Sequence, residues 1–112
     1  MALARTYSLI TRQALELLGK QIRLARKQRR MTEADLAQRV GIARSTLQLV
    51  EKGDPKVEIG TVFEAAVLVG VSLFTAEGAA SSLAPELGRL DASLQLLPKK
   101  IRHPAREVKD DF

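Results

Sequence analysis

The residues of this sequence that could do chemistry are mostly basic, and they gather in its first half. Between Lys20 and Arg30 stand six basic residues and no acidic one. Side chains of this type neutralise phosphate groups, which supplies affinity for nucleic acid regardless of base sequence. A solvated helix face is the plainer interpretation, and both interpretations stay open at this point. A membrane-surface helix would need a face of Trp, Phe or Leu, which this stretch does not form.

Net charge is distributed unevenly along the chain. The 112 residues carry 18 Lys and Arg against 13 Asp and Glu, for a net charge of +5. Residues 1–60 hold 12 basic and 6 acidic side chains, residues 61–98 hold one and four, and residues 99–112 hold five and three. This asymmetry indicates a basic binding face in the first half and a different role for the remainder.

Residue types exclude several kinds of catalytic and metal site. The chain has no cysteine, and His103 is its only histidine, which rules out thiolate ligands, disulfides and histidine pairs. Paired carboxylates in a plausible pocket, a Gly-rich phosphate loop and a set of metal ligands are also missing. We therefore expect no enzyme, no catalytic residue, no metal and no cofactor. The lack of cysteine and of a long apolar run favours a cytoplasmic protein that does not contact a membrane.

The elements that must position the basic residues are helices. Proline occurs only after residue 54, so the first half can hold uninterrupted helices. A first helix is predicted to begin at a cap formed by Ser8 or Thr11 and to run to about Arg29, with Gly19 tolerated at a cost of about 1 kcal/mol. Its apolar residues at helical spacing are Ile10, Ala14, Leu17, Leu18, Ile22 and Ala25.

Two short helices follow, over residues 33–40 and 44–52. Thr32 precedes the first of them, and the acidic residue three positions later completes a capping-box pattern. Gly41 ends this helix, because glycine adopts the left-handed conformation without steric penalty. Ala43 occupies the cap position before the second helix, where its side chain cannot make a capping hydrogen bond.

Further along the chain, residues 54–59 are predicted to form a turn or loop. A fourth helix over residues 61–69 is ended by Gly70, and a short fifth helix is expected over residues 72–75. No alternation of strand period occurs in residues 1–98, so the chain is expected to be all-α.

The pair of helices around Gly41 reads as a helix-turn-helix. Five apolar residues turn one face of each helix toward a shared core, and Ala37 lies where the helices would cross closely. In such a unit the second helix can lie in the major groove of DNA while the first crosses the backbone. The five apolar residues are Leu36, Val40, Ile42, Leu47 and Val50.

From about Leu17 to Phe74, the sequence resembles the lambda-repressor/Cro, or Xre-type, family of transcriptional regulators. The matching stretches are Ile22-Arg-Leu-Ala-Arg-Lys, Met31-Thr-Glu-Ala-Asp-Leu-Ala, Gly41-Ile-Ala-Arg-Ser-Thr-Leu, Val50-Glu-Lys-Gly and Gly70-Val-Ser-Leu.

This resemblance implies a role for each matching position and makes residues 44–52 the recognition helix. Base-reading contacts are implied for Ala43, Arg44, Ser45, Gln48 and Leu49. Phosphate contacts are implied for Lys27, Thr32, Lys52 and Lys56, and a structural ion pair for Arg26 with Glu51. Two alternatives stay open. In one, Arg44 is an ordinary solvated arginine; in the other, Ser45 only hydrogen-bonds to the nearby backbone.

Glu33 departs from the pattern of that family. The family frequently has a glutamine at this position, where its amide meets a phosphate. A carboxylate cannot donate to a phosphate, so Glu33 is expected to serve the N-terminus of its own helix instead.

The last third of the chain carries a row of leucines with alternating spacings of four and three. This row predicts a helix that starts at Ser81 or Ser82 near Pro85 and stops at Pro98. Two interpretations stay open, because two heptads are fewer than a coiled coil requires: packing on its own domain, or a dimer or partner interface. The row consists of Leu83, Leu87, Leu90, Leu94 and Leu97.

The order of elements also resembles one subgroup, the HipB-like antitoxins that partner HipA-type toxin kinases. This second resemblance rests on three features: Gly53-Asp-Pro, Gly60-Thr-Val-Phe-Glu-Ala-Ala, and the leucine-rich segment followed by a basic tail. The subgroup implies a homodimer that binds a palindromic operator in double-stranded DNA, represses its own operon and holds a toxin kinase inactive. A stand-alone Xre-type regulator, or a module that chiefly binds proteins, is the alternative.

The expected architecture is an all-α, compact bundle of about five helices with a helix-turn-helix, followed by a C-terminal leucine-rich helix and a tail. Residues 1–76 are predicted to form the DNA-binding domain and residues 77–98 the dimerisation or docking helix. Residues 99–112 form a charged tail, either disordered or docked through its apolar residues, in which His103 has no role.

Overall fold

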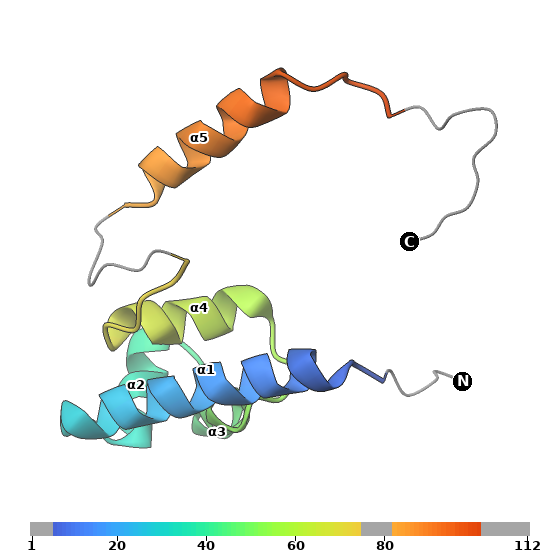
Figure 1. Cartoon of the computed structure of the whole chain (residues 1–112). Helices are drawn as coiled ribbons and strands as arrows, with labels where there is room; N and C mark the ends of the chain where they lie inside the picture. The colour runs from blue at the N-terminus through green and yellow to red at the C-terminus, as the bar shows by residue number, and fades with distance from the viewer. Residues whose placement is uncertain (1–5, 75–81, 102–112) are drawn as a thin grey trace. The chain divides into compact units, whose positions relative to one another are not determined.

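The computed structural model describes residues 6–74 and 82–101, which form five α-helices and no strand (Figure 1). The chain divides into two units, residues 1–80 and residues 81–112. The first unit contains α1 (Leu9–Gln28), α2 (Glu33–Val40), α3 (Arg44–Lys52) and α4 (Ile59–Leu68), and the second contains α5 (Ala84–Gln95). The all-α prediction is confirmed for this part of the chain.

The first helix, α1, has a side-chain cap at its start and an unusual residue after its end. The hydroxyl of Ser8 accepts from the backbone amide of Thr11 at 3.4 Å. At the other end Arg30 adopts a φ of +58°, and the amide of Met31 reaches back to the carbonyl of Arg26 at 3.1 Å. This closing bond satisfies a carbonyl that the helix leaves open, although no glycine marks the position.

The α2–turn–α3 segment forms as predicted. The hydroxyl of Thr32 accepts from the amide of Asp35, and the carboxylate of Asp35 accepts from the amide of Thr32, both at 3.0 Å. Gly41 ends α2 with a φ of +87°. No side-chain hydrogen bond caps α3 at Ala43.

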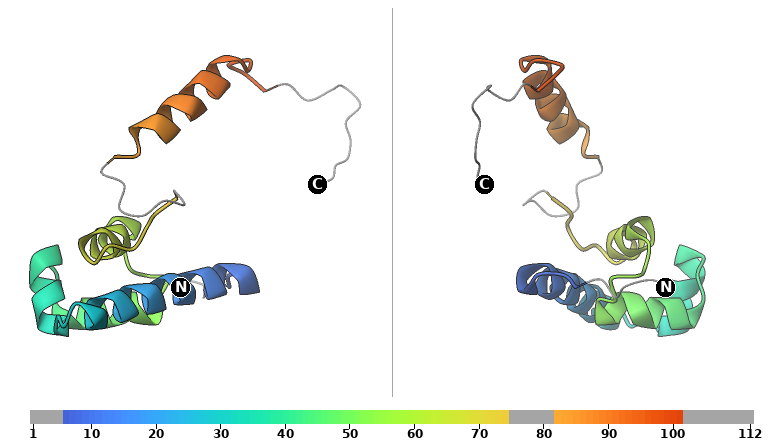
Figure 2. Two further views of the ribbon diagram at one scale, coloured as in Figure 1. Left: turned by 60° about the vertical axis from the view of Figure 1, so that its left-hand side comes forward. Right: turned by 90° about the vertical axis from the view of Figure 1, so that its right-hand side faces the viewer.

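The core of the first unit lies where these helices meet. In Figures 1 and 2, α1 runs alongside α3, and the contacts show that α1 and α2 each pack on both α3 and α4. Val40 and Ile42 lie at the edge of the core, partly buried, so the predicted apolar set of the helix-turn-helix faces inward. The buried residues are Ile22, Leu36, Ala37, Leu47, Val50, Val62, Ala65, Ala66 and Val69.

The segment around α4 differs from the prediction at both ends. The helix begins at Ile59, two residues earlier than expected, and the short helix expected over residues 72–75 is absent from residues 72–74. Gly70 turns the chain with a φ of +83°. Val71 and Leu73 then pack on the core from alternate positions, which a helix of the same length could not achieve. Thr75 lies outside the described residues.

The second unit has α5 as its only described helix, and α5 buries none of its residues. The helix starts at Ala84, whose amide donates to the hydroxyl of Ser82 at 3.0 Å, and it ends at Gln95, before the proline expected to stop it. Ser81, His103 and the tail from residue 102 onward lie outside the described residues. In the predicted row Leu83 is half-buried, and the exposed members are Leu87, Leu90, Leu94 and Leu97.

Candidate nucleic-acid interface

Helix α3 presents one face to the core and the other to solvent. Leu47 and Val50 are buried in the core. The residues predicted to read bases lie on the other side, where Gln48 is half-buried and Ala43, Arg44, Ser45 and Leu49 are exposed. The helix therefore offers a continuous row of accessible side chains from its first turn onward.

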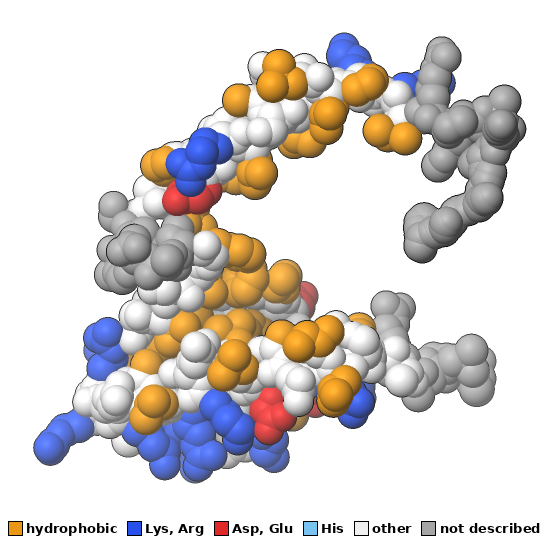
Figure 3. Space-filling model, viewed as in Figure 1, with side chains coloured by type: hydrophobic (Ala, Val, Ile, Leu, Met, Phe, Trp, Pro, Cys, Tyr) orange, Lys and Arg blue, Asp and Glu red, His pale blue; other side chains and the backbone are white. Residues whose placement is uncertain are grey.

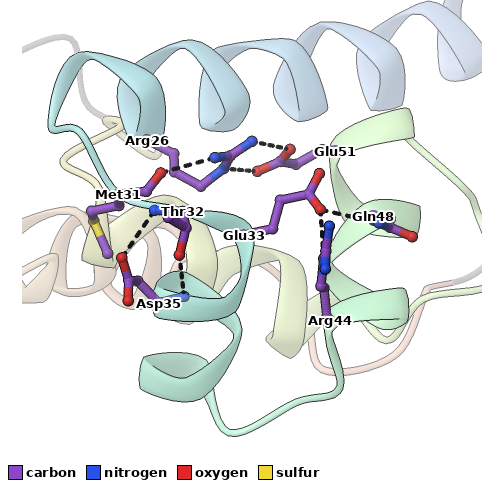
Figure 4. A network of polar contacts seen from close by, with 8 residues as sticks. All are labelled: Arg26, Met31, Thr32, Glu33, Asp35, Arg44, Gln48 and Glu51. Atoms are coloured by element: carbon purple, nitrogen blue, oxygen red, sulfur yellow. Dashed lines mark hydrogen bonds and ion pairs between the residues drawn. The ribbon is translucent and has the colours of Figure 1, made fainter.

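A buried ion pair holds α3 against α1. The guanidinium of Arg26 donates to both carboxylate oxygens of Glu51, from Nε at 2.7 Å and from Nη2 at 3.0 Å (Figure 4). The remaining NH2 group of this guanidinium, Nη1, donates to the carbonyl of Met31 at 2.9 Å. Arg26 is 5% exposed and Glu51 7%, so the pair fixes the two helices rather than facing a ligand. The hydrogen bonds to Glu51 raise the pKa of Arg26, against the opposing effect of burial.

Glu33, at the start of α2, joins two of the predicted base-reading side chains. Its Oε1 atom accepts from Nε of Arg44 at 2.9 Å and from Nε2 of Gln48 at 3.0 Å (Figure 4). The hydrogen bonds from Gln48 and Arg44 lower the pKa of Glu33, so this group is a carboxylate at neutral pH. Glu33 does stand in the first turn of α2, where its negative charge is favourable, while the capping hydrogen bonds there are made by Thr32 and Asp35.

Two shallow depressions flank Glu33 on the surface of the first unit. One is lined by two predicted phosphate ligands, Lys27 and Thr32, together with Arg44 and Arg23. The other is lined by Lys52, another predicted phosphate ligand, and by Gln48, with Arg23 again at its edge. Three of the four predicted phosphate ligands are thus brought near the predicted base-reading residues.

The fourth predicted phosphate ligand, Lys56, stands in the turn after α3. Its side chain is exposed, and its backbone amide donates to the carboxylate of Asp54 at 2.8 Å. Arg23 is a residue that sequence reasoning did not assign to the site. It belongs to the basic stretch of α1, and its place three residues before Arg26 on the same helix face is the signal that could have identified it.

The basic side chains of the first unit lie mainly on one side of it. Figure 3 shows Lys and Arg gathered along the lower edge of this unit, with apolar side chains above them. Such a distribution gives a polyanion one face to approach. Within the described ranges, no group of three or more His, Cys, Asp or Glu residues could hold a metal ion, and no helix is long and apolar enough to cross a membrane.

Comparison with known proteins agrees with this geometry. Residues 22–75 match the family model described as Helix-turn-helix. No curated protein and no solved structure gives a significant match. The matched region begins in α1 and ends just after α4, so it contains both depressions and all of α3. Residues 22–75 are an Xre-type helix-turn-helix domain, the kind of domain with which transcriptional regulators bind DNA.

Proposed function

We propose that the chain is a sequence-specific transcriptional repressor that binds a palindromic operator in double-stranded DNA. The observation that carries this proposal is the exposed face of α3, which is bordered by basic side chains from α1. An exposed helix with this border fits the major groove, where its first turn meets base edges and the basic residues meet the phosphates on either side.

Each exposed residue of α3 has a chemistry suited to bases. Arg44 can donate two hydrogen bonds to guanine O6 and N7, and Gln48 can pair with adenine. Leu49 offers an apolar contact to a thymine methyl group, and Ala43 and Ser45 approach the bases from the start of the helix. Phosphates are contacted by Lys27, Thr32, Lys52 and Lys56, which position the protein without reading sequence.

The proposal includes a homodimer closed through α5. Three leucines of the predicted row, Leu87, Leu90 and Leu94, are exposed on this helix and offer a surface that a second copy could cover, and Leu97 is exposed just after the helix. A two-fold dimer places its two recognition helices on half-sites about 34 Å apart, which explains why the operator would be palindromic. Under the proposal, residues 1–76 bind DNA and residues 77–98 assemble the dimer.

The narrower form of the proposal makes the chain the antitoxin of a type II toxin–antitoxin pair. It would repress its own operon and neutralise a HipA-like kinase, as the order of its sequence elements implies. Co-expression with the adjacent reading frame tests this form: co-purification with a kinase-like product supports it. A dimer that purifies alone beside such a product argues for a stand-alone regulator.

Selection of DNA from a random-sequence pool tests the broader proposal. We expect the wild-type chain to enrich one palindromic duplex. Arg44→Ala should then cost about 1–3 kcal/mol at its own base pair and relax the preference there, whereas Lys52→Ala should weaken binding to all sequences alike. If no motif is enriched, or if Arg44→Ala leaves discrimination intact, α3 does not read the groove as proposed.

A further inference from the structure

The starting observation is that one oxygen atom of Glu33 holds two predicted base-reading side chains at once. Oε1 accepts from Arg44 at 2.9 Å and from Gln48 at 3.0 Å. The side chain of Glu33 is 27% exposed and that of Arg44 is 66% exposed. The acceptor is therefore partly sheltered, while the arginine that it holds still reaches into solvent.

The atom by which Arg44 is held decides what it can still do. Arg44 uses Nε for Glu33, which leaves both terminal NH2 groups of the guanidinium free. These two NH2 groups form the outer edge of the guanidinium, with which an arginine can donate to guanine O6 and N7 at the same time. Gln48 gives one amide hydrogen to Glu33 and keeps its carbonyl oxygen and its second hydrogen for a base.

The charge of Glu33 matters as well as its hydrogen bonds. The carboxylate lies among cations, because Arg23 and Lys27 line one adjoining depression with it, and Lys52 lines the other. A negative charge in this place repels the phosphates of any duplex and competes with them for the same cations. The effect lowers affinity without reference to base sequence, and contacts to bases are then needed to offset it.

We propose that Glu33 is a positioning residue that sets the sequence specificity of this interface. It holds Arg44 and Gln48 ready for their bases, and its charge weakens binding to duplexes that offer them no matching base. The inference rests on the proposed function and adds to it a determinant outside the recognition helix.

Two substitutions separate the charge from the hydrogen bonds. Glu33→Gln keeps a carbonyl oxygen as an acceptor and removes the charge, whereas Glu33→Ala removes both. Glu64→Gln is the matched control, since it removes the same charge from the exposed surface of α4, which packs on α1 and α2. The probes are the duplex selected by the wild-type chain, the same duplex changed at the base pair that Arg44 reads, and a scrambled duplex of equal length.

We expect both Glu33 variants to bind the scrambled duplex about three- to tenfold more tightly than wild type, because a repulsive charge is lost. Preference for the selected duplex should fall about threefold in Glu33→Gln and tenfold or more in Glu33→Ala, which frees Arg44 and Gln48 as well. Glu64→Gln should leave this preference unchanged. Urea unfolding of each variant establishes that the domain is folded at the temperature of the titrations.

A double-mutant cycle with Arg44→Ala distinguishes a positioning role of Glu33 from a purely structural one. If Glu33 acts through Arg44, Glu33→Ala should change discrimination at the Arg44 base pair in the wild-type background and not in the Arg44→Ala background. Equal effects in both backgrounds would overturn the positioning role, and unchanged affinity for the scrambled duplex would overturn the role of the charge. If the wild type enriches a motif while the Glu33 variants keep its full preference, this inference alone fails. If the wild type enriches nothing, the proposed function fails and takes this inference with it.

Discussion

Gly19 of α1 lies directly against the last turn of α3, where a methyl group on its Cα would stand 2.6 Å from the carbonyl oxygen of Glu51. The carbonyl oxygen of Val50 would be as near, at 2.7 Å. Both are backbone atoms, so neither can move aside without moving the helix. The two helices therefore approach each other as closely as they do because position 19 has no side chain.

We predict that Gly19→Ala destabilises the first unit even though alanine is the better helix former. Helix propensity favours the variant by about 1 kcal/mol, but forcing α1 away from α3 should cost more, so the net loss should be about 1–3 kcal/mol. The free energy of unfolding in urea measures this loss. Gly60→Ala is the control, because Gly60 is in α4 and a methyl group there meets nothing within 4 Å. A Gly19→Ala variant as stable as this control would contradict the close approach.

The Arg26–Glu51 pair gives a second prediction. Arg26→Met should lower the free energy of unfolding by about 3–5 kcal/mol, because it leaves the buried carboxylate of Glu51 without its partner. Replacing both residues by apolar ones of similar volume, as in Arg26→Met with Glu51→Leu, should recover most of that loss. Chemical denaturation of both variants measures the difference. A double variant no more stable than Arg26→Met alone would show that packing, rather than the unpaired charge, causes the loss.

Asp35 gives a prediction about pH. Hydrogen bonds from the backbone and hydroxyl of Thr32 lower the pKa of Asp35, so its carboxylate stabilises the folded state above its ordinary pKa of about 4. This contribution should be lost as the pH falls through the lowered value, because the unfolded chain binds the proton more readily. Wild type should therefore be more stable than Asp35→Asn at pH 7, and the difference should shrink below about pH 4.

Measurement of unfolding from pH 7 to pH 2 tests this prediction. A difference between wild type and Asp35→Asn that stays constant across this range would mean that the capping carboxylate has the same pKa in the folded and unfolded chain.

The leucine row of α5 gives a prediction about assembly. If a second copy covers the row, Leu90→Ala removes apolar contact from both copies, and dimerisation should weaken at least about tenfold. Sedimentation equilibrium measures the dissociation constant. Leu96→Ala is the matched control, because Leu96 is 86% exposed and stands outside the row. A chain that stays monomeric at every concentration would remove the homodimer from the proposed function.

The helices of the first unit could be predicted from the sequence because their boundaries depend on local chemistry. The capping box of Thr32 and Asp35 needs only residues three apart, and the turn at Gly41 needs only a residue that tolerates a positive φ. Helical spacing likewise identified the core residues of α2 and α3, since Leu36 and Leu47 are both fully buried. In α1 it identified Ile22, which is buried, but Ile10 and Leu17 of the same predicted row are exposed.

Features that depend on how two helices cross were not predictable in the same way. Glu33 meets Arg44 and Gln48 across 11 and 15 residues, and no local pattern indicates that contact. Gly19 was interpreted as a small loss of helix propensity, because its neighbour in α3 is visible only once the helices are packed. Arg30 carries no signal for its left-handed backbone, since an arginine adopts that conformation only where the surrounding structure requires it.

The hydrogen bonds of Arg26 and Arg29 change what the basic composition of α1 means for a polyanion such as heparin. Arg26 is enclosed and neutralised by Glu51. Arg29 donates from Nε to the carbonyl of Val69 at 2.7 Å, so its positive charge stands at the C-terminal end of α4, where it is favourable. Two of the six cations between Lys20 and Arg30 therefore also hold α1 against neighbouring helices through hydrogen bonds. Arg29 stays exposed and keeps its charge, so retention on a heparin column should follow the five cations other than Arg26, and ranking such proteins by sequence charge alone would overstate their basic surface.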